Sequence, residues 1–359
     1  MRWSRNKNNK SLQRGGTRMK RFVRLVFVVS FILTTLMFGI PTQQAEAKVM
    51  LLMAGSSAAT TSISQAGMRF VKRVQEDSKG EIMISFKPGG ELYADKDIPT
   101  AISQGAIDLA VTNFGTWSGI VPSLVAIDLA GGVYEDVQHL YKAQAGAMGQ
   151  ILKTDLAAKD GILVGWGDSG PTNVFLSKKK LLSHPADLKG LLVRCPNNVV
   201  RWLMEAYGAT PTFASVSELY TALERNTLDG AFSAMDPSKA QKLYEAAPNV
   251  TWVTTSVSAP MGVVASKRGW AKLTPAQQDL ILKAWAIEME WNRTDVAQKN
   301  LDAWDYYTKN PKVKTHRVTD EEQRKEWDPI AREYQLKKFI ELVGKEKADQ
   351  LLKAIAAAK

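Results

Sequence analysis

The feature that most restricts the fold of this chain is a long helical run near its C-terminus. Residues 274–277 read Thr-Pro-Ala-Gln, a capping box with proline at the first helical position. From there to about Lys309 no glycine or proline interrupts the run. Its apolar residues recur at helical spacing: Ile281, Trp285, Met289, Val296, Trp304 and Tyr307. A helix of about 35 residues is about 50 Å long. Because this length exceeds the width of one small domain, we expect the helix to pack across two lobes.

Strand patterns alternate with helical patterns through most of the remaining chain. Short apolar or alternating runs predict strands at residues 48–54, 82–86, 109–114, 161–166, 190–195, 229–235 and 260–266. This alternation predicts an α/β fold in which helices cover both faces of the sheets. Residues 100–111 and 221–232 both run helix, turn, Asp, strand, and so place Asp108 and Asp229 equivalently. That echo supports two similar lobes.

The N-terminus has the three regions of a secretory signal peptide. Residues 1–24 hold nine Lys or Arg residues and no acidic residue, residues 25–40 are uncharged, and Ala45-Glu46-Ala47 is a small-x-small end. The 16 uncharged residues are fewer than the roughly 20 that a spanning helix needs. We therefore expect cleavage after Ala47 and a periplasmic mature protein. The start codon stays open between Met1 and Met19.

Charge and cysteine content exclude several classes of protein. Removing residues 1–47 takes away nine basic residues and one acidic residue, which lowers the formal net charge from +11 to +3. The remaining chain has no dense basic run interleaved with aromatic residues, so nucleic acid is not an expected partner. Cys195 is the only cysteine, so no internal disulfide can form.

Residues 167–170, Gly-Asp-Ser-Gly, match the surroundings of the nucleophile in chymotrypsin-like serine proteases. A serine nucleophile needs a base and an orienting acid close to it. The histidines His139, His184 and His316 are scattered along the sequence, and no Gly-x-Ser-x-Gly elbow frames Ser169. We expect no catalytic residues and no enzyme activity, and an exported hydrolase that uses Ser169 is a remote alternative.

Several motifs in one order resemble a known family. They are "GGELYADKDIPTAISQGAIDLAV" at 89–111, "PADLKGLLVRCPNN" at 185–198, "YGATPTFASVSELYTALERNTLDGAFS" at 207–233 and "SAPMGVVASKRGWAKLTPAQQ" at 258–278. Together with the long helix that follows, they resemble the DctP-like solute receptors of tripartite ATP-independent periplasmic (TRAP) transporters. The resemblance covers essentially the whole mature chain.

The resemblance implies a two-lobed periplasmic-binding-protein fold with hinge strands and a long helix that spans both lobes. Lobe I is expected to contain 48–168 and about 257–298, and lobe II 169–256 and about 299–359. The family also implies a small organic acid that is held between the lobes and delivered to a TRAP membrane permease. In the first crossing between the lobes, Gly165, Gly167 and Gly170 are expected to supply backbone freedom, and Ser169 becomes a turn residue or ligand neighbour.

The family's arginine at the end of the "LKGLxxRxP" strand pairs with the substrate carboxylate, and Arg194 occupies that place. A planar guanidinium with parallel N–H donors matches a carboxylate and stays charged. Asn197 matches a position that commonly contacts the ligand. The other candidate ligand-binding residues are Trp166, Asn173, Ser233, Asn113, Glu91 and Ser56.

The sequence departs from the family's pattern at three places. A second arginine is replaced by Asn173 or Val174, a frequent ligand asparagine by Ser233, and an aromatic residue by Val216. These losses argue against a strongly polar sugar acid and against a dicarboxylate held at both ends. A monocarboxylate with a modest or apolar body fits better.

No cofactor and no metal is expected, because Arg194 supplies the positive charge and the sequence shows no acidic cluster for the cleft. A monomer is favoured over a dimer, in which residues 274–309 and 339–359 would pair with a second copy. The sequence leaves open which acid is bound and whether a cation assists it. It also leaves open an alternative role, a ligand-sensing periplasmic receptor that feeds a signalling system.

Overall fold

The computed structural model describes residues 48–170, 173–254 and 260–359. Residues 48–359 form one compact unit, and the predicted signal peptide at 1–47 lies outside the described residues. Within the described ranges, every helix is either too short or too polar to cross a membrane.

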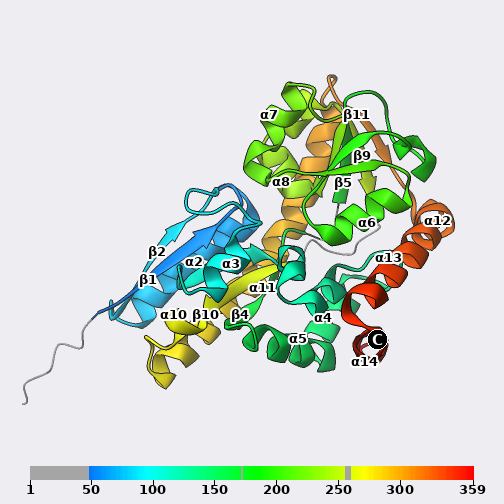
Figure 1. Cartoon of the computed structure of the whole chain (residues 1–359). Coiled ribbons are helices and arrows are strands. Elements are labelled where there is room, and N and C mark those ends of the chain that lie inside the picture. Colours follow the sequence, from blue (N-terminus) through cyan, green and yellow to red (C-terminus); the bar gives the residue numbers. More distant parts are fainter. Residues whose placement is uncertain (1–47, 171–172, 255–259) are drawn as a thin grey trace, which may run out of the picture. The chain divides into compact units, whose positions relative to one another are not determined.

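The first sheet has five strands in the order β2-β1-β3-β10-β4 (Figure 1). Its strands are β1 Val49–Gly55, β2 Ile82–Lys87, β3 Leu109–Asn113, β4 Gly161–Asp168 and β10 Pro260–Ser266. β1 pairs in parallel with β2 and β3, whereas β10 runs antiparallel to β3 and β4. Since β10 follows strands β5 to β9 of the second sheet in the sequence and precedes β11, the chain crosses between the sheets more than once.

The second sheet has six strands in the order β11-β9-β5-β8-β6-β7. Its strands are β5 Asn173–Ser177, β6 Leu192–Cys195, β7 Thr210–Phe213, β8 Gly230–Ala234, β9 Asn249–Val253 and β11 Lys314–Arg317. β6 is parallel to β7 and β8, and β5 is antiparallel to β8 and β9.

Helices cover both faces of both sheets, as the alternating pattern predicts. The longer helices are α2 Ser62–Asp77, α4 Val137–Ala145, α5 Ala147–Ala157, α6 Asn198–Ala206, α11 Pro275–Lys309, α13 Asp328–Val343 and α14 Lys345–Ala356. The short α-helices are α3 Ile98–Ser103, α7 Leu219–Glu224, α8 Met235–Ala240, α9 Leu243–Ala246, α10 Lys267–Trp270 and α12 Asp320–Glu322. The 3₁₀ helices are η1 Phe114–Gly119, η2 Pro122–Asp128, η3 Pro185–Leu188 and η4 Val216–Glu218, and η5 Gln323–Trp327 is a π-helix.

The long helix α11 begins and ends where the sequence predicts, and it packs on both sheets. Thr274 accepts a hydrogen bond from the Gln277 amide at the N-terminus. Trp285, in the first half of α11, lies in the core that α2 and the first sheet form. Tyr307, in the last turn of α11, lies in the core between α7, α9 and the second sheet. Figure 1 shows the helix running past both sheets. The expected α/β architecture with a long spanning helix is confirmed.

The last helix, α14, packs on the half of the molecule that contains the first sheet. Leu351 and Ile355 of α14 share a buried cluster with Leu140 of α4 and Leu152 of α5. These contacts place α14 in the buried cluster that α4 and α5 form. The lobe boundary expected near residue 299 stays a prediction.

Asp108 and Asp229 have matching roles in the two sheets. The Asp108 carboxylate accepts a hydrogen bond from the Leu52 amide (2.9 Å) and pairs with Lys272 (2.7 Å). The Asp229 carboxylate accepts one from the Leu192 amide (3.0 Å) and pairs with Lys179 (2.7 Å). The similarity between residues 100–111 and 221–232 therefore reflects a repeated arrangement, in which an Asp carboxylate binds a strand amide and a lysine.

The glycines of the first crossing serve two different purposes. Gly170 has a φ of 112°, a conformation that favours glycine. Gly165 and Gly167 do not have positive φ, so neither needs to be glycine for its backbone conformation, and a hinge role for them stays a prediction. A Cβ at Gly165 would lie 2.3 Å from Trp285 Cδ1, and one at Gly167 would lie 3.0 Å from Ile63 Cδ1. These two glycines let β4 lie directly against α11 and α2.

Candidate functional site

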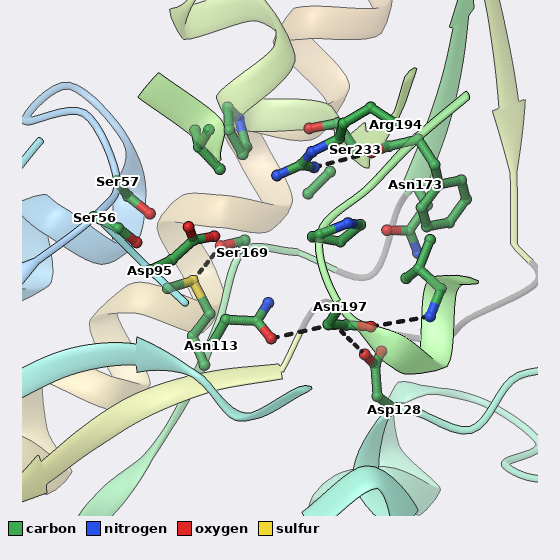
Figure 2. A pocket seen from close by; sticks show the side chains of 17 residues that line it. Ser56, Ser57, Asp95, Asn113, Asp128, Ser169, Asn173, Arg194, Asn197 and Ser233 are labelled. Carbon is green, nitrogen blue, oxygen red and sulfur yellow. Dashed lines mark hydrogen bonds between the residues drawn. The ribbon is translucent and has the colours of Figure 1, made fainter. Parts of the chain in front are cut away.

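A cavity of about 70 Å³ lies where the strand ends of the two sheets meet (Figure 2). From the first sheet, Ser56 follows β1, Asn113 ends β3 and Ser169 follows β4. From the second sheet, Arg194 lies on β6 and Ser233 on β8. These parallel strands direct their carboxyl ends at the cavity, which is where open α/β sheets bind ligands.

Arg194 is buried at this cavity, with 1% of the residue exposed. Its Nε donates to the Ala214 carbonyl (2.9 Å) and its Nη1 to the Phe232 carbonyl (3.1 Å). Its Nη2 is buried and has no hydrogen-bond partner. Burial lowers the pKa of the guanidinium, and the Asp95 carboxylate raises it. The two carbonyls therefore hold the Arg194 guanidinium in place, and the N–H donors of its Nη2 stay available for a ligand.

Asp95 lies on the other side of the cavity, in the loop between β2 and α3. Two backbone bonds fold this loop against the end of β1: the Gly89 amide donates to the Ser57 carbonyl (2.8 Å) and the Gly90 amide to the Gly55 carbonyl (2.9 Å). Asp95 is 4% exposed, and its Oδ1 has no hydrogen-bond partner. Burial raises the pKa of the Asp95 carboxyl, and Arg194 opposes that rise. A buried acid and a buried base therefore line the same cavity.

Asn197 joins the two halves of the site through its side chain. Its Oδ1 accepts a hydrogen bond from the Val200 amide (2.9 Å) and so caps α6. Its Nδ2 donates to Asp128 (3.0 Å), which lies at the end of η2, and to Asn113 (3.4 Å). The side chain is therefore used for capping and for contact between the halves.

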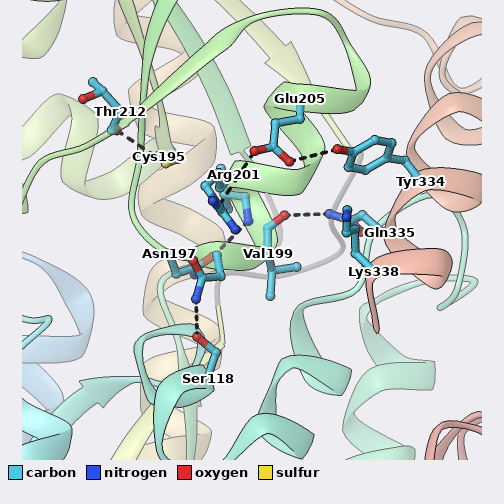
Figure 3. Close-up of polar contacts among 12 residues, drawn as sticks. Ser118, Cys195, Asn197, Val199, Arg201, Glu205, Thr212, Tyr334, Gln335 and Lys338 are labelled. Atoms are coloured by element: carbon cyan, nitrogen blue, oxygen red, sulfur yellow. Dashed lines mark hydrogen bonds and ion pairs between the residues drawn. The ribbon is translucent and has the colours of Figure 1, made fainter. Parts of the chain in front are cut away.

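Further polar contacts hold α6 in place (Figure 3). The Asn198 side chain donates to the Ser118 hydroxyl (2.9 Å) of η1. From α13, Gln335 Nε2 donates to the Val199 carbonyl (2.9 Å) and the Tyr334 hydroxyl to Glu205 (3.0 Å). Gln335 Oε1 also accepts from the Ala130 amide (2.8 Å). The capped end of α6 is thus fixed beside Arg194.

The structure brings six of the eight sequence-predicted site residues to the cavity: Ser56, Asn113, Asn173, Arg194, Asn197 and Ser233. Trp166 and Glu91 are not among its lining residues. Trp166 instead packs against Phe114, with ring centroids 4.9 Å apart, and Glu91 is exposed to solvent.

Sequence reasoning did not find the two acidic residues at the cavity, Asp95 and Asp128. Asp95 belongs to the run "ADKD", which resembles a solvated polar loop, and only its burial distinguishes it from Asp97. Neither at the cavity nor elsewhere in the described ranges is a group of three or more His, Cys, Asp or Glu residues arranged to hold a metal ion.

Ser169 lines the cavity without a base beside it. Its hydroxyl donates to Met261 Sδ (2.8 Å). His139 bonds to the Ile355 carbonyl, His184 to Glu326, and His316 lies on the edge strand β11. No histidine of the described chain lines the cavity. Ser169 therefore lacks the surroundings of a nucleophile.

The sequence matches the family described as bacterial extracellular solute-binding protein, family 7 (DctP) over residues 53–341. The chain belongs to this family. A protein of Haemophilus influenzae without a described function is 30% identical over 268 residues, which are 73% of this chain and 79% of that protein. The expected membership among DctP-like receptors is confirmed, and the family consists of solute-binding proteins rather than enzymes.

Solved structures agree with this assignment. A TRAP periplasmic solute-binding protein of Sulfurospirillum deleyianum with bound succinate has a TM-score of 0.78 and 25% identity, covering 87% of this chain and 100% of that one. A sugar acid binding protein of Advenella mimigardefordensis in complex with galactonate has a TM-score of 0.79 and 23% identity, covering 87% and 99%. This DctP-family chain therefore has the fold of an extracytoplasmic solute receptor.

Proposed function

We propose that this protein captures a small monocarboxylic acid in the cavity between its two sheets and delivers it to a TRAP membrane permease. The observation that carries the proposal is the buried Arg194, whose Nη2 has no partner and lines the cavity. A guanidinium donates strong charge-assisted hydrogen bonds to a carboxylate, above all where water is excluded.

The charges at the cavity favour a ligand with one carboxylate. Succinate and galactonate, the ligands in the two solved structures, carry two carboxylates and one, so the family does not decide the number. Among the described lining residues, Arg194 is the only Lys or Arg, and Asp95 and Asp128 are negative when ionised. A second carboxylate would meet these acids without a second cation to offset them.

Two substitutions of Arg194 test the proposal. Arg194→Ala is expected to abolish measurable binding of monocarboxylates, and Arg194→Lys to weaken it by about tenfold or more, because an ammonium is a point charge that cannot reproduce a planar set of donors. Isothermal titration calorimetry against a panel of monocarboxylates measures both effects, and thermal melts show that the variants fold.

Arg201→Ala is the matched control, because Arg201 lies on α6, pairs with Glu205 and is absent from the cavity lining. The affinity of the Arg201→Ala variant for monocarboxylates is expected to equal that of the wild-type protein. An Arg194→Ala protein that binds normally would refute the proposal, even if it melts at a lower temperature.

We also propose that residues 1–47 are a cleaved signal peptide and that the exported receptor acts as a monomer. β1 begins at Val49, so cleavage after Ala47 leaves the first strand complete. Mass spectrometry of the exported protein is expected to give an N-terminus at Lys48, and light scattering a single-chain mass. A mature N-terminus inside β1 would contradict the cleavage site.

A further inference from the structure

Helix α6 packs on both halves of the molecule, the half built on the first sheet and the half built on the second. Its side chains Val200 and Leu203 share a buried cluster with residues of the second sheet. Its side chains Val199 and Trp202 belong to a different buried cluster, which contains Trp117 of η1 and residues of the first sheet. Separating the halves therefore exposes apolar surface on one face of α6, which costs free energy in water.

A hydrogen bond between two side chains accompanies this apolar contact. Asn198, the first residue of α6, donates from its Nδ2 to the Ser118 hydroxyl of η1 (2.9 Å), and Figure 3 marks this bond with a dashed line at Ser118. Ser118 is buried, with 5% of the residue exposed. Neither side chain is among the described residues that line the cavity. The bond joins protein atoms only, so it forms without a ligand.

Gln335 of α13 makes a second polar link between the halves. Its Nε2 donates to the Val199 carbonyl of α6 (2.9 Å), and its Oε1 accepts from the Ala130 amide, two residues after η2 (2.8 Å). Along α13, Ala331 belongs to the buried cluster of the second sheet and Phe339 to that of the first. Gln335 therefore bonds both halves at the point where α13 passes from one core to the other.

A ligand reaches the cavity only when the two halves move apart. Arg194 and Asn197, which line the cavity, are each 1% exposed, and the cavity volume is about 70 Å³. The arrangement that encloses the cavity is the closed one. Contacts between the halves that need no ligand raise the fraction of closed molecules before binding. A receptor whose binding-competent arrangement is only partly populated binds more weakly in proportion to that fraction.

We infer that Ser118, Asn198 and Gln335 form a latch between α6 and the first half of the molecule, and that this latch sets the fraction of closed receptor. They are positioning residues, because they act on the arrangement of the cavity and do not line it. The inference rests on the proposed function, since it concerns closure around the proposed ligand. It predicts that residues outside the cavity scale the affinity for every ligand by one common factor.

Ser118→Ala and Asn198→Ala test the latch through affinity. Gln335 stays in place, because its removal leaves a buried carbonyl and a buried amide without partners. By calorimetry, each variant is expected to bind butyrate, pyruvate and benzoate more weakly by the same factor, about two- to tenfold, as one neutral hydrogen bond predicts. The double variant should bind no more weakly than either single variant, since both remove one bond.

Gln298→Ala is the matched control, because it removes a side-chain amide bond to Asp302 (2.8 Å) that lies within α11. Its affinity for the three acids is expected to equal that of the wild-type protein. Additive losses in the double variant, or losses that differ widely among the three acids, would contradict the latch.

Small-angle X-ray scattering tests the latch without any ligand. The ligand-free Ser118→Ala and Asn198→Ala proteins are expected to have a larger radius of gyration than the wild-type protein, because more molecules are open. A residue that only stabilises the fold lowers the Tm when it is removed and leaves the radius of the folded protein unchanged. An unchanged radius in both variants would overturn the inference, whatever their Tm or affinity.

The two measurements separate failure of this inference from failure of the proposed function. If the acids bind the wild-type protein through Arg194 and the radius of the latch variants does not change, only the inference fails. If no monocarboxylate binds, the proposed function fails, and the scattering of the ligand-free proteins still decides whether the latch exists.

Discussion

Asp95 is the residue whose ionisation most directly links the cavity to stability. Burial raises the pKa of its carboxyl, so the folded protein holds this proton more tightly than the unfolded chain does. The contribution of this carboxyl to the free energy of unfolding is therefore fully present below the ordinary pKa of Asp, near 3.9. That contribution is lost as the pH rises through the higher pKa of Asp95 in the folded protein. Asp95→Asn is expected to raise the Tm of the ligand-free protein at pH 7 and to leave it unchanged near pH 3. Calorimetric melts between pH 3 and 8 measure the difference. The exposed Asp97→Asn serves as the control, and an equal gain from both variants would contradict the assignment.

At the scale of elements, η1 meets the capped end of α6 through a glycine. A Cβ at Gly115 would lie 2.1 Å from Asn197 Nδ2, whereas a Cβ at Gly119 of the same helix would have nothing within 4 Å. Gly115→Ala is expected to displace Asn197, to destabilise the protein by about 1 kcal/mol or more through the lost cap, and to weaken ligand binding. Gly119→Ala is expected to change neither property.

A double-mutant cycle shows whether the clash acts through Asn197. In an Asn197→Ala background the displaced amide is absent, so Gly115→Ala is expected to have little additional effect on urea unfolding. Additive losses of stability in the double variant would show that Gly115 acts through another contact.

For the molecule as a whole, the cavity draws its lining from both sheets, so the ligand that we propose for it would contact both at once. A ligand that binds only the folded form stabilises it by about 2.7 kcal/mol at a concentration 100-fold above Kd. Monocarboxylates that bind are therefore expected to raise the Tm in proportion to the logarithm of their concentration. Thermal shift measurements over a concentration series test this expectation, with Arg194→Ala as the control. Binding by calorimetry without any rise in Tm would show that the ligand does not favour the folded state.

The sequence by itself determined the features that depend on local patterns. The capping box and the absence of glycine and proline set the limits of α11, because helix ends are controlled by nearby residues. The echo at Asp108 and Asp229 identified a repeated device, since helix, turn and strand signals recur in one order. The motifs and their order identified the family. They also placed Arg194 near the end of a strand, and the fold directs the end of that strand at the cavity.

Only the tertiary structure decided which side chains lose their contact with water. Asp95 and Asp97 stand two positions apart in one polar loop, yet only Asp95 is buried, because the turn at Gly89 and Gly90 folds its side of the loop against the end of β1. Trp166 belongs to a strand that reaches the site, but its ring packs against Phe114 instead of lining the cavity. Burial and side-chain direction depend on contacts between segments that are far apart in the sequence. Local sequence patterns do not predict such contacts.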